Sequence, residues 1–459
     1  HSPCRIRRHL SVRRRIRFGI FSTLVFLLPS WILMHTLFFP SYTDPPAHYA
    51  ELRRRVRDFP DFPGVANPSG QKVFIAAALY DPDGNLLSDV WATPVRRLIH
   101  ILGPGNVFLS LYENDPSPIA AAALAVFRES LECPASVVTE PVDYSALPHV
   151  VTAAGQRRLK RMAFLAHVRN RALDPLETHP IAANTRWDRL LYLNDVIFDP
   201  VDAANLLLST NHPDVDGADA SSLAPAHPRY RAACAVDFIS PAKFYDTFAT
   251  RDIDGFTPGA PFFPWFTTAG TSRTRNAVLR GSDAVPVSSC WSGMVAFDAK
   301  PFLSRPSTPV LSHRPLRFRA ENETYWDSSE CCLIHADLAV HLDDGPSDGG
   351  SSIYLNPFIR VAYSSHVYDW LPALRRVEHL FTPVQHLVNL VARLPRHNPR
   401  RTHFVGRSER VRVWRASDEG YVEMERTAAP GGFCGTRSLF WLDEETGGER
   451  WGWEPAPAG

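Results

Sequence analysis

Hydrophobic residues along the chain form one long run near the N-terminus and many short runs after it. Residues 18–39 contain no Asp, Glu, Lys or Arg, and as a helix rising about 1.5 Å per residue they would be long enough to cross a bilayer. From residue 72 onward, short apolar runs typical of buried strands alternate with segments of helical character. The pattern predicts a transmembrane helix followed by a large α/β domain.

The first part of this domain carries the clearest predicted elements. Val73 to Tyr80 and Val107 to Tyr112 read as strands, with a helix between them that ends near Leu102. Ser117 to Leu131 and Arg157 to Leu173 read as helices. This alternation predicts a mostly parallel sheet, which binds its ligands at the carboxyl ends of its strands.

One predicted strand ends in an acid. The apolar run Leu190 to Leu193 leads directly into Asn194 and Asp195. A carboxylate at the end of a buried strand is costly unless it pairs with a cation or meets solvent in a cleft. Many enzymes that transfer sugars from nucleotide donors hold a divalent ion on the donor diphosphate at such a position. We therefore predict that Asp195 binds Mn²⁺ or Mg²⁺ and that Asn194 contributes to the donor site.

Charge is concentrated at the N-terminus, although the net charge of the whole chain is only +1. Seven arginines precede residue 18 without an acidic partner, which places the N-terminus in the cytoplasm and the main body in a lumen. A buried helix of a soluble protein is the alternative interpretation of residues 18–39. The small net charge gives no reason to expect a nucleic-acid partner.

Composition divides the chain into five predicted parts. Residues 40–71, rich in Pro and Arg, are expected to form a stem that holds the domain away from the membrane. The parts are a basic cytoplasmic tail (1–17), a transmembrane anchor (18–39), the stem (40–71), the main domain (72–394) and a partly irregular C-terminal extension (395–459).

A lumenal location would favour disulfides and glycosylation. The cysteines after the predicted anchor are Cys133, Cys234, Cys290, Cys331, Cys332 and Cys434. We expect none of them to be a free thiol, and we expect Cys331 and Cys332 to have different partners, although the sequence does not fix the pairing. Asn322 begins a glycosylation sequon.

Polar residues on the predicted helix from Arg157 are candidates for donor binding. Asn170 interrupts an apolar stripe, and Arg161 and Arg169 lie nearby on the helix. A polar side chain on such a stripe must find hydrogen-bond partners. These residues could contact the base or ribose of a nucleotide; alternatively, Asn170 tethers a loop carbonyl and the arginines are ordinary solvated charges.

Further acids follow a second apolar strand. Asp237 ends the run that begins at Cys234, and Asp246 and Asp252 follow in a polar stretch. Carboxylates accept hydrogen bonds from sugar hydroxyls, so Asp237 and Asp252 are candidate catalytic or substrate-contacting residues. A salt-bridged loop is the alternative. Trp291 could stack on a sugar ring, or could be a core residue beside a disulfide.

Two candidates lie further along the chain. Glu330 begins a predicted helix and could face the acceptor across the site, although an acid in a first turn often only compensates the helix dipole. His366 follows the predicted strand Ile359 to Tyr363 and is a candidate ligand of a metal or diphosphate; an exposed His is more often neither.

Taken together, several segments resemble one family. The segments are Phe74 to Ala77, Arg169 to Leu173, Leu193 to Val196, Ala233 to Phe238, Phe244 to Phe248, Arg251-Asp252, Ser289 to Trp291, Ser329 to Cys332, and Gly431 to Gly435. In this order they resemble the fungal capsule-associated α-1,3-mannosyltransferases, the cryptococcal mannosyltransferase family, over about Lys72 to Tyr363. The chain departs from the expected pattern at Ala78 and Ser292.

The resemblance implies a function as well as a fold. It implies a type II Golgi membrane enzyme with a GT-A nucleotide-sugar transferase domain, in which Asp195 matches the metal-site acid. It further implies transfer of mannose from GDP-mannose, with retention, to a hydroxyl of a mannose-containing glycan for capsule or cell-wall synthesis. The alternatives are a transferase that uses another donor, such as UDP-galactose or GDP-fucose, and an inactive lumenal scaffold for polysaccharide assembly.

Overall fold

A computed structural model describes residues 27, 29–34, 36–212, 228–304, 314–340, 352–444 and 450–458. Most of the predicted anchor and most of two polar segments, 213–228 and 341–352, lie outside these residues. Within the described part of the chain, no helix is both long enough and apolar enough to cross a membrane.

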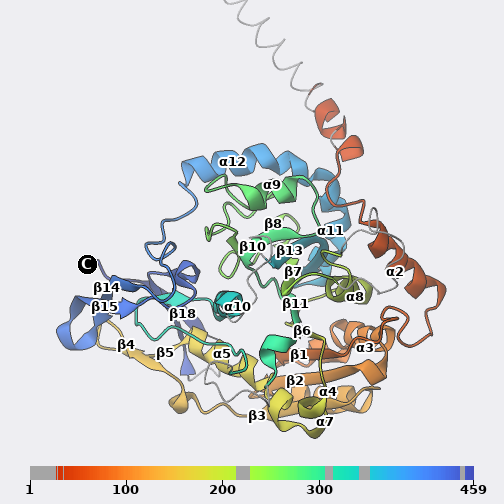
Figure 1. Cartoon of the computed structure of the whole chain (residues 1–459), viewed down its shortest axis with the longest axis horizontal. Coiled ribbons are helices and arrows are strands. Elements are labelled where there is room, and N and C mark those ends of the chain that lie inside the picture. Colours follow the sequence, from red (N-terminus) through yellow and green to blue (C-terminus); the bar gives the residue numbers. More distant parts are fainter. Residues whose placement is uncertain are drawn as a thin grey trace, which may run out of the picture.

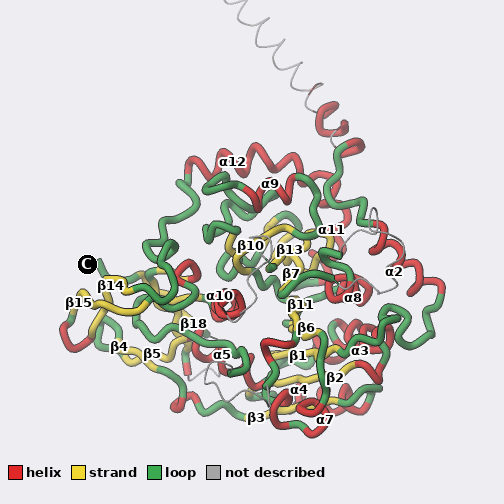
Figure 2. Tube along the Cα trace, in the orientation of Figure 1, coloured by secondary structure: helices red, strands yellow, loops and turns green. Residues whose placement is uncertain are grey.

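A ten-stranded mixed sheet forms the centre of the molecule, with strand order β3-β2-β1-β6-β11-β7-β13-β10-β9 and β8 paired to β7 (Figures 1 and 2). Its first four strands are parallel; β1, β2 and β6 follow the predicted strands closely, whereas β3 was not predicted. Their bounds are β1 Val73–Leu79, β2 Val107–Asn114, β3 Ala135–Glu140 and β6 Arg189–Leu193. Strands β1, β2 and β6 are apolar over nearly their whole length because both faces of the sheet are covered.

The second half of the sheet is mixed, which corrects the prediction of a mostly parallel sheet. Strand β11 lies antiparallel between β6 and β7, whereas β7 and β13 are parallel to each other. The strands of this half are β7 Ala232–Ser240, β8 Lys243–Phe244, β9 Arg251–Asp252, β10 Val285–Ser289, β11 Met294–Asp298 and β13 Ile353–Ala362. Strands β10 and β11 both run antiparallel to the pair β7 and β13, and they flank this pair on its two sides.

Helices pack around the sheet in both halves (Figure 1). They are α2 Ala47–Asp58, α3 Ala92–Leu102, α4 Pro118–Glu129, α5 Arg161–Arg171, α6 Pro175–Thr178, α7 Pro180–Asn184, α8 Pro200–Leu208, α9 Arg273–Leu279, α10 Glu330–Val340, α11 Ser365–Val377 and α12 Phe381–Val391. The predicted helix from Arg157 is half correct, because its first four residues form strand β5, Arg157–Lys160, and α5 begins only at Arg161. Lys160 ends the strand with a buried ion pair to Asp327.

The C-terminal extension is more regular than expected. It contributes the hairpin of β14 Ser408–Arg415 and β15 Gly420–Thr427, and the strands β17 Ser438–Leu442 and β18 Trp451–Pro455. Strand β17 pairs with β5, which also pairs with β4, His149–Val151, so the extension completes a four-stranded sheet with residues from the first half of the chain. A short ladder between β12, Asp327–Ser328, and β16, Gly435–Thr436, joins it again.

The predicted stem is part of the folded domain. Tyr49, Leu52 and Val56 form one buried stripe of α2, which packs against α8. The hydroxyl of Tyr42 donates a hydrogen bond to the carbonyl of Val278 at 2.9 Å. Residues 41–71 therefore do not form a stem that separates the domain from the membrane. The sequence did not reveal this packing because the apolar residues of α2 are interleaved with arginines.

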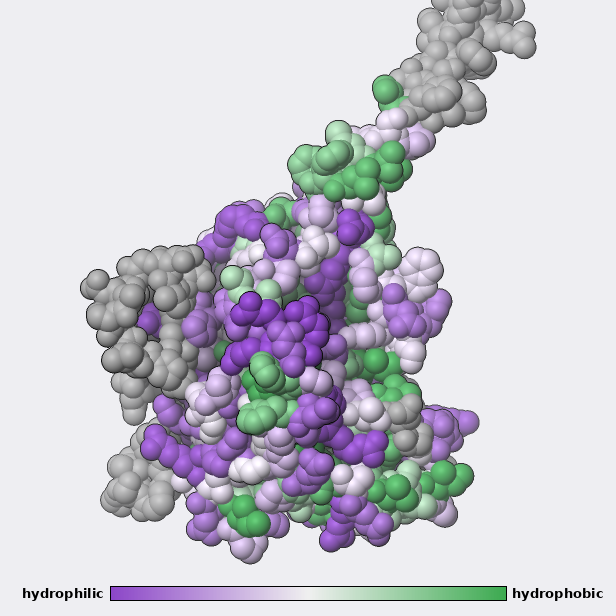
Figure 3. Space-filling model, turned by 90° about the vertical axis from the view of Figure 1, so that its right-hand side faces the viewer, coloured by the Kyte–Doolittle hydropathy of each residue, from purple (hydrophilic) through white to green (hydrophobic). Residues whose placement is uncertain are grey.

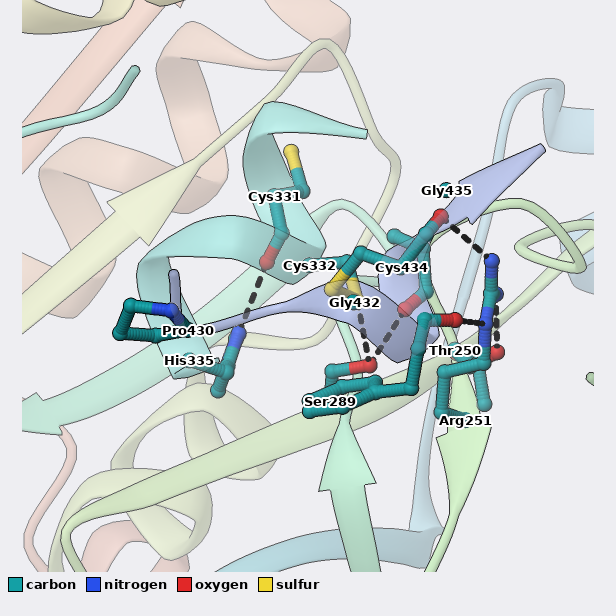
Figure 4. Close-up of a disulfide and its surroundings, with 12 residues drawn as sticks. Thr250, Arg251, Ser289, Cys331, Cys332, His335, Pro430, Gly432, Cys434 and Gly435 are labelled. Atoms are coloured by element: carbon teal, nitrogen blue, oxygen red, sulfur yellow. Dashed lines mark hydrogen bonds between the residues drawn. A yellow bond between two sulfur atoms is a disulfide. The ribbon is translucent and has the colours of Figure 1, made fainter. Parts of the chain in front are cut away.

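Among the described cysteines, Cys234 is bonded to Cys290 and Cys332 to Cys434. Cys133 and Cys331 are buried free thiols. The expectation of no free thiol is wrong. Cys331 and Cys332 do not bond to each other, as expected, but the expectation that each has a disulfide partner is wrong for Cys331. As neighbours on α10 they point in different directions, and only Cys332 reaches Cys434 (Figure 4).

Candidate functional site

A cavity of about 680 Å³ opens at the carboxyl ends of the parallel strands. Residues from the ends of β1, β2, β6 and β13 line it, and α5, the first turn of α10 and the loop after β8 supply the other walls. This edge is where α/β sheets bind ligands, and the volume suits a nucleotide sugar. Residues of β17 and β18, from the C-terminal extension, also line the cavity.

Asp195 lies in this cavity, immediately after β6, as predicted. Its side chain is exposed to the cavity, but protein surrounds it on the other sides, and this loss of solvent raises the pKa of its carboxyl. Asn194 beside it is held on both sides of its backbone. Its N–H donates to the carbonyl of Gly293 at 2.8 Å, and its carbonyl accepts from the indole of Trp91 at 2.9 Å. The backbone at the end of β6 is therefore fixed, and the carboxylate of Asp195 lines the cavity.

Arg169 connects three predicted site residues. Its Nε donates to Glu330 at 2.9 Å, and its Nη1 donates to the side-chain oxygen of Asn194 at 3.0 Å. The guanidinium also stacks over the ring of Trp291 at 4.5 Å. Arg169 and Glu330 are both buried, so this ion pair is shielded from solvent on the cavity wall. The cluster fixes Glu330 and Asn194 relative to each other.

Trp291 is a core residue beside a disulfide, one of its two predicted roles, and it also reaches the cavity. Its ring packs against Tyr192 and Phe318, with centroids 5.1 and 5.6 Å away, and it follows Cys290 of a disulfide. It also lines the cavity, and its buried indole nitrogen has no hydrogen-bond partner in the structure. Trp291 is therefore mainly a core residue that supports Arg169, with one edge at the cavity.

A pair of buried acids forms another wall. The Asp237 carboxylate accepts from the hydroxyl of Tyr363 at 3.1 Å and from the backbone N–H of Asp246 at 3.0 Å. Burial, together with the neighbouring charge of Asp246, raises the pKa of Asp237 to about 8, so Asp237 carries a proton at neutral pH. Asp246 instead accepts hydrogen bonds from the backbone of Ala249, Trp291 and Ser292, so it holds two loops together.

Arg161 and aromatic residues of the C-terminal extension close the cavity. Arg161, the first residue of α5, stacks over the ring of Trp451 at 4.5 Å. Burial lowers the pKa of Arg161. Phe440, Leu442 and Trp451 line the same wall. Arg161 is thus a cation that faces the cavity beside an aromatic surface.

Three predicted site residues do not line this cavity. Asn170 exchanges two hydrogen bonds with the backbone of Phe318, at 2.9 and 2.8 Å, which is the tether given above as its alternative role. The carboxylate of Asp252 accepts from the backbone N–H groups of Asp254 and Phe256, so it caps a turn. His366 is exposed in the first turn of α11.

Sequence reasoning missed other cavity residues. Asp246 lies in the acidic stretch already singled out, but the sequence does not show which of its acids faces inward. Tyr363 ends a predicted strand, a position that points to the ligand edge. Trp451 is the third, and its spacing of two residues from Trp453, typical of side chains on one face of a strand, was a signal for it.

Comparison with known proteins identifies the family. The family model described as "Cryptococcal mannosyltransferase 1" matches residues 72–337. The chain belongs to this mannosyltransferase family. The match contains Asp195, Arg169 and Glu330 but ends before β13 and the C-terminal extension. Among curated proteins, none matches the chain.

Solved structures give distant similarities. One is the mannosyltransferase PcManGT from Pyrobaculum calidifontis in complex with GDP-Man and Mn²⁺, at 12% identity and a TM-score of 0.33, covering 82% of this chain and 77% of that one. Another is glucosyl-3-phosphoglycerate synthase from Mycobacterium tuberculosis in complex with Mg²⁺ and uridine diphosphate, at 14% identity and a TM-score of 0.30, covering 85% and 94%. Superpositions this loose say nothing about individual residues.

Proposed function

We propose that the protein transfers mannose from GDP-mannose to a hydroxyl of a mannose-containing glycan, with retention and in α-1,3 linkage. The family match supports the sugar, and the cavity at the carboxyl edge of the sheet supports a nucleotide-sugar substrate. The observation that carries the proposal is the placement of Asp195: a strand-end carboxylate, exposed in the cavity, next to Asn194, whose backbone is fixed by hydrogen bonds on both sides.

The cavity fits a hard divalent ion that is held largely by its substrate. Among the described residues, the one cluster of three candidate metal ligands is Cys234, Cys290 and His335, and the two cysteines are consumed by a disulfide. Among the described residues, no group of three such ligands therefore includes Asp195. Mg²⁺ and Mn²⁺ commonly bind through one or two carboxylates together with substrate phosphates and water. When bound, such an ion would neutralise the charge of the departing diphosphate.

The chain's own residues then take distinct roles. Arg161, a cation on the cavity wall, is placed to bind the negatively charged diphosphate. Glu330, whose second oxygen is not engaged by Arg169, can accept a hydrogen bond from a sugar hydroxyl. Asp237, which carries a proton at neutral pH, can donate one. The buried walls exclude water, which protects the donor from hydrolysis.

Asp195→Asn tests the function. We expect mannose transfer to fall at least about a hundredfold, because stabilisation of a leaving diphosphate is worth several kcal/mol, while thermal stability changes little. Asp298→Asn is a matched control: Asp298 also ends a strand, β11, but this strand runs antiparallel and ends beside Arg189 at the opposite edge of the sheet. Near-normal transfer by Asp195→Asn would refute the role of Asp195.

Turnover of a panel of nucleotide sugars tests the donor. GDP-mannose should be the preferred substrate, with chelation abolishing transfer and Mn²⁺ restoring it. Preference for UDP-galactose or GDP-fucose would leave the site intact but change the substrate. Absence of turnover with every donor would favour the scaffold.

For localisation we propose a single-pass type II protein of the Golgi membrane, with the catalytic domain in the lumen. The arginine-rich start, the apolar stretch of residues 18–39 and the exposed sequon residue Asn322 support this proposal. Protease added to sealed microsomes should spare the domain, and Asn322 should carry a glycan. Digestion of the domain in intact vesicles would overturn the lumenal assignment.

A further inference from the structure

The hairpin of β17 and β18 presents an aromatic face to the cavity. Phe440 pairs directly with Trp453, and Leu442 pairs with Trp451. Directly paired residues, and residues two apart on a strand, lie on the same face of a sheet. Phe440, Leu442 and Trp451 line the cavity, so Trp453 continues this face beyond the rim.

This face is left open, whereas the opposite face of the hairpin is packed. Trp451 and Trp453 are 52% and 54% exposed. On the other face, Leu439 is buried with Val150 and Tyr325, and the ring of Trp441 lies under the guanidinium of Arg158 at 4.1 Å. An exposed apolar patch that continues a substrate cavity indicates a binding surface.

We propose that Phe440, Trp451 and Trp453, here called the aromatic ledge, bind the acceptor glycan along successive hexose units. The inference rests on the proposed function, since it assigns the acceptor end of the same site. A flat indole matches the C–H face of a sugar ring while leaving its hydroxyls in water, and Arg161 over Trp451 can donate hydrogen bonds to them. Residues two apart on a strand are separated by roughly 6.6 Å, which suits a chain of sugars better than one small molecule.

Acceptor length provides the test, because Trp453 lies outside the cavity lining. In full-length protein, Trp453→Ala should raise the KM for mannohexaose about tenfold, as expected for loss of one stacking contact. The KM for GDP-mannose, the KM for mannobiose and kcat should be unchanged. Trp370→Ala is the matched control: Trp370 is 53% exposed on α11 and belongs to neither hairpin strand.

The outcomes separate the ledge from the proposed function. An unchanged KM for mannohexaose, or equal losses for mannobiose and mannohexaose, would refute the ledge while leaving mannose transfer intact. If the protein turns over no GDP-mannose, direct titration with mannohexaose still decides: quenching of tryptophan fluorescence that is lost in Trp453→Ala supports the ledge, and absence of binding refutes it.

A separate observation concerns helix α12, which buries polar side chains and exposes apolar ones. Its buried side includes Gln385 and Asn389, which bind the interior through hydrogen bonds. The Gln385 amide donates to the carbonyl of Phe266 at 3.1 Å, and the Asn389 oxygen accepts from the N–H of Ala260 at 2.7 Å. The exposed side is an apolar stripe at helical spacing, formed by Val384, Leu387, Val388 and Val391.

The stripe lies on the part of the surface from which the N-terminal segment leaves. The backbone N–H of Ser41 donates to the carbonyl of Arg375 at 2.7 Å, and Arg375 lies in the last turn of α11, just before α12. The helical residues around 29–38 project from this edge of the molecule and present apolar surface (Figures 1 and 3). Exposed arginines flank α12, Arg376 before it and Arg393 after it.

From this arrangement we infer that α12 lies in the surface of a lipid bilayer, with its apolar stripe among the acyl chains and the flanking arginines at the headgroups. Helices of this kind bind membranes through an apolar face bordered by basic residues. The adjacent N-terminal segment, apolar over residues 18–39, favours a bilayer over a second copy of the chain as the occupant.

A fluorescent label on the stripe tests this contact. Leu387→Cys, labelled with bimane in full-length protein reconstituted into phosphatidylcholine and phosphatidylserine vesicles, should lose its fluorescence to nitroxides on the acyl chains. Val126→Cys is the control, because Val126 is an equally exposed apolar residue of α4, at the far side of the molecule from α12 (Figure 1). A Leu387→Cys label that acyl-chain nitroxides do not quench refutes the inference, and copy-to-copy crosslinking of that variant would assign the stripe to a dimer.

Discussion

Replacing Glu330 by Gln would separate a substrate-contacting acid from a purely structural one. Glu330 is the first residue of α10 and is buried, and it accepts the Nε–H of Arg169 at 2.9 Å and the thiol of Cys331 at 3.3 Å. The glutamine side chain would keep nearly the same shape and one acceptor oxygen. It would remove the negative charge that compensates Arg169.

The burial of the ion pair sets the size of the stability loss expected for Glu330→Gln. The side chains of Arg169 and Glu330 are only 10% and 3% exposed, so water cannot replace the missing charge. Removing a buried ionic partner outright costs about 3–5 kcal/mol. Because Gln retains a hydrogen bond and Arg169 keeps its bond to Asn194, we expect Glu330→Gln to cost about 1.5–3 kcal/mol, the worth of a charged hydrogen bond.

A second buried pair provides the matched control. Arg360 donates two hydrogen bonds to Glu378, at 3.0 and 2.7 Å, and neither residue lines the cavity. Glu378→Gln should lower the free energy of unfolding by a similar amount without affecting transfer. Glu330→Gln should in addition lower kcat about a hundredfold or more, the size of a typical acid–base or hydroxyl-orienting contribution. Denaturant melts and mannose-transfer kinetics measure both quantities.

Equal kinetics in the two variants would refute the catalytic assignment of Glu330. The residue would then serve only to neutralise Arg169 beneath the cavity. Loss of transfer with no loss of stability would instead contradict the magnitude given for the buried pair.

Three further predictions concern the rest of the fold. Since the pKa of Asp237 is raised to about 8 in the folded protein, the folded protein keeps this proton between about pH 4 and pH 8, whereas the unfolded chain releases it. The free energy of unfolding should therefore fall across this range by up to about 1.4 kcal/mol per pH unit, and Asp237→Asn should flatten that slope, as denaturant melts would show. Leu52→Ala should cost about 2–5 kcal/mol because Leu52 is in the core, whereas the exposed Arg54→Ala should change stability by under about 0.5 kcal/mol; equal effects would contradict the packing of α2. After denaturation without reduction, alkylation should modify Cys133 and Cys331 and spare Cys234, Cys290, Cys332 and Cys434, and mass spectrometry that finds Cys331 protected would disprove the pairing.

The sequence predicted best where one physical constraint dominates. Strands β1, β2 and β6 are buried on both faces, so their apolar runs mark them almost to the residue. Asp195 was found for the same reason, because a polar residue ends such a run. All the family motifs except Gly431 to Gly435 lie within the matched residues 72–337, and this match confirms the recognition.

Prediction failed where a residue's role depends on distant partners. Strand β5 exists because β17, nearly 300 residues later, pairs with it, and no local pattern at Arg157–Lys160 records that pairing. The same holds for the free thiols: the direction in which Cys331 points is set by the packing of α10, not by the spacing of cysteines.

The candidate acids show how tertiary context sorts residues that look alike in sequence. Asp195 and Asp237 each follow an apolar run and Asp252 lies in the polar stretch after the second run, and the surroundings of the three acids differ. Asp195 faces the cavity; Asp237 lies buried beside Tyr363; and one oxygen of Asp252 accepts from two backbone N–H groups of its own turn. The carboxylate of Asp252 therefore organises that turn, whereas the exposed carboxylate of Asp195 can meet a substrate. Substitution of Asp195 should therefore act on catalysis, and substitution of Asp252 on folding.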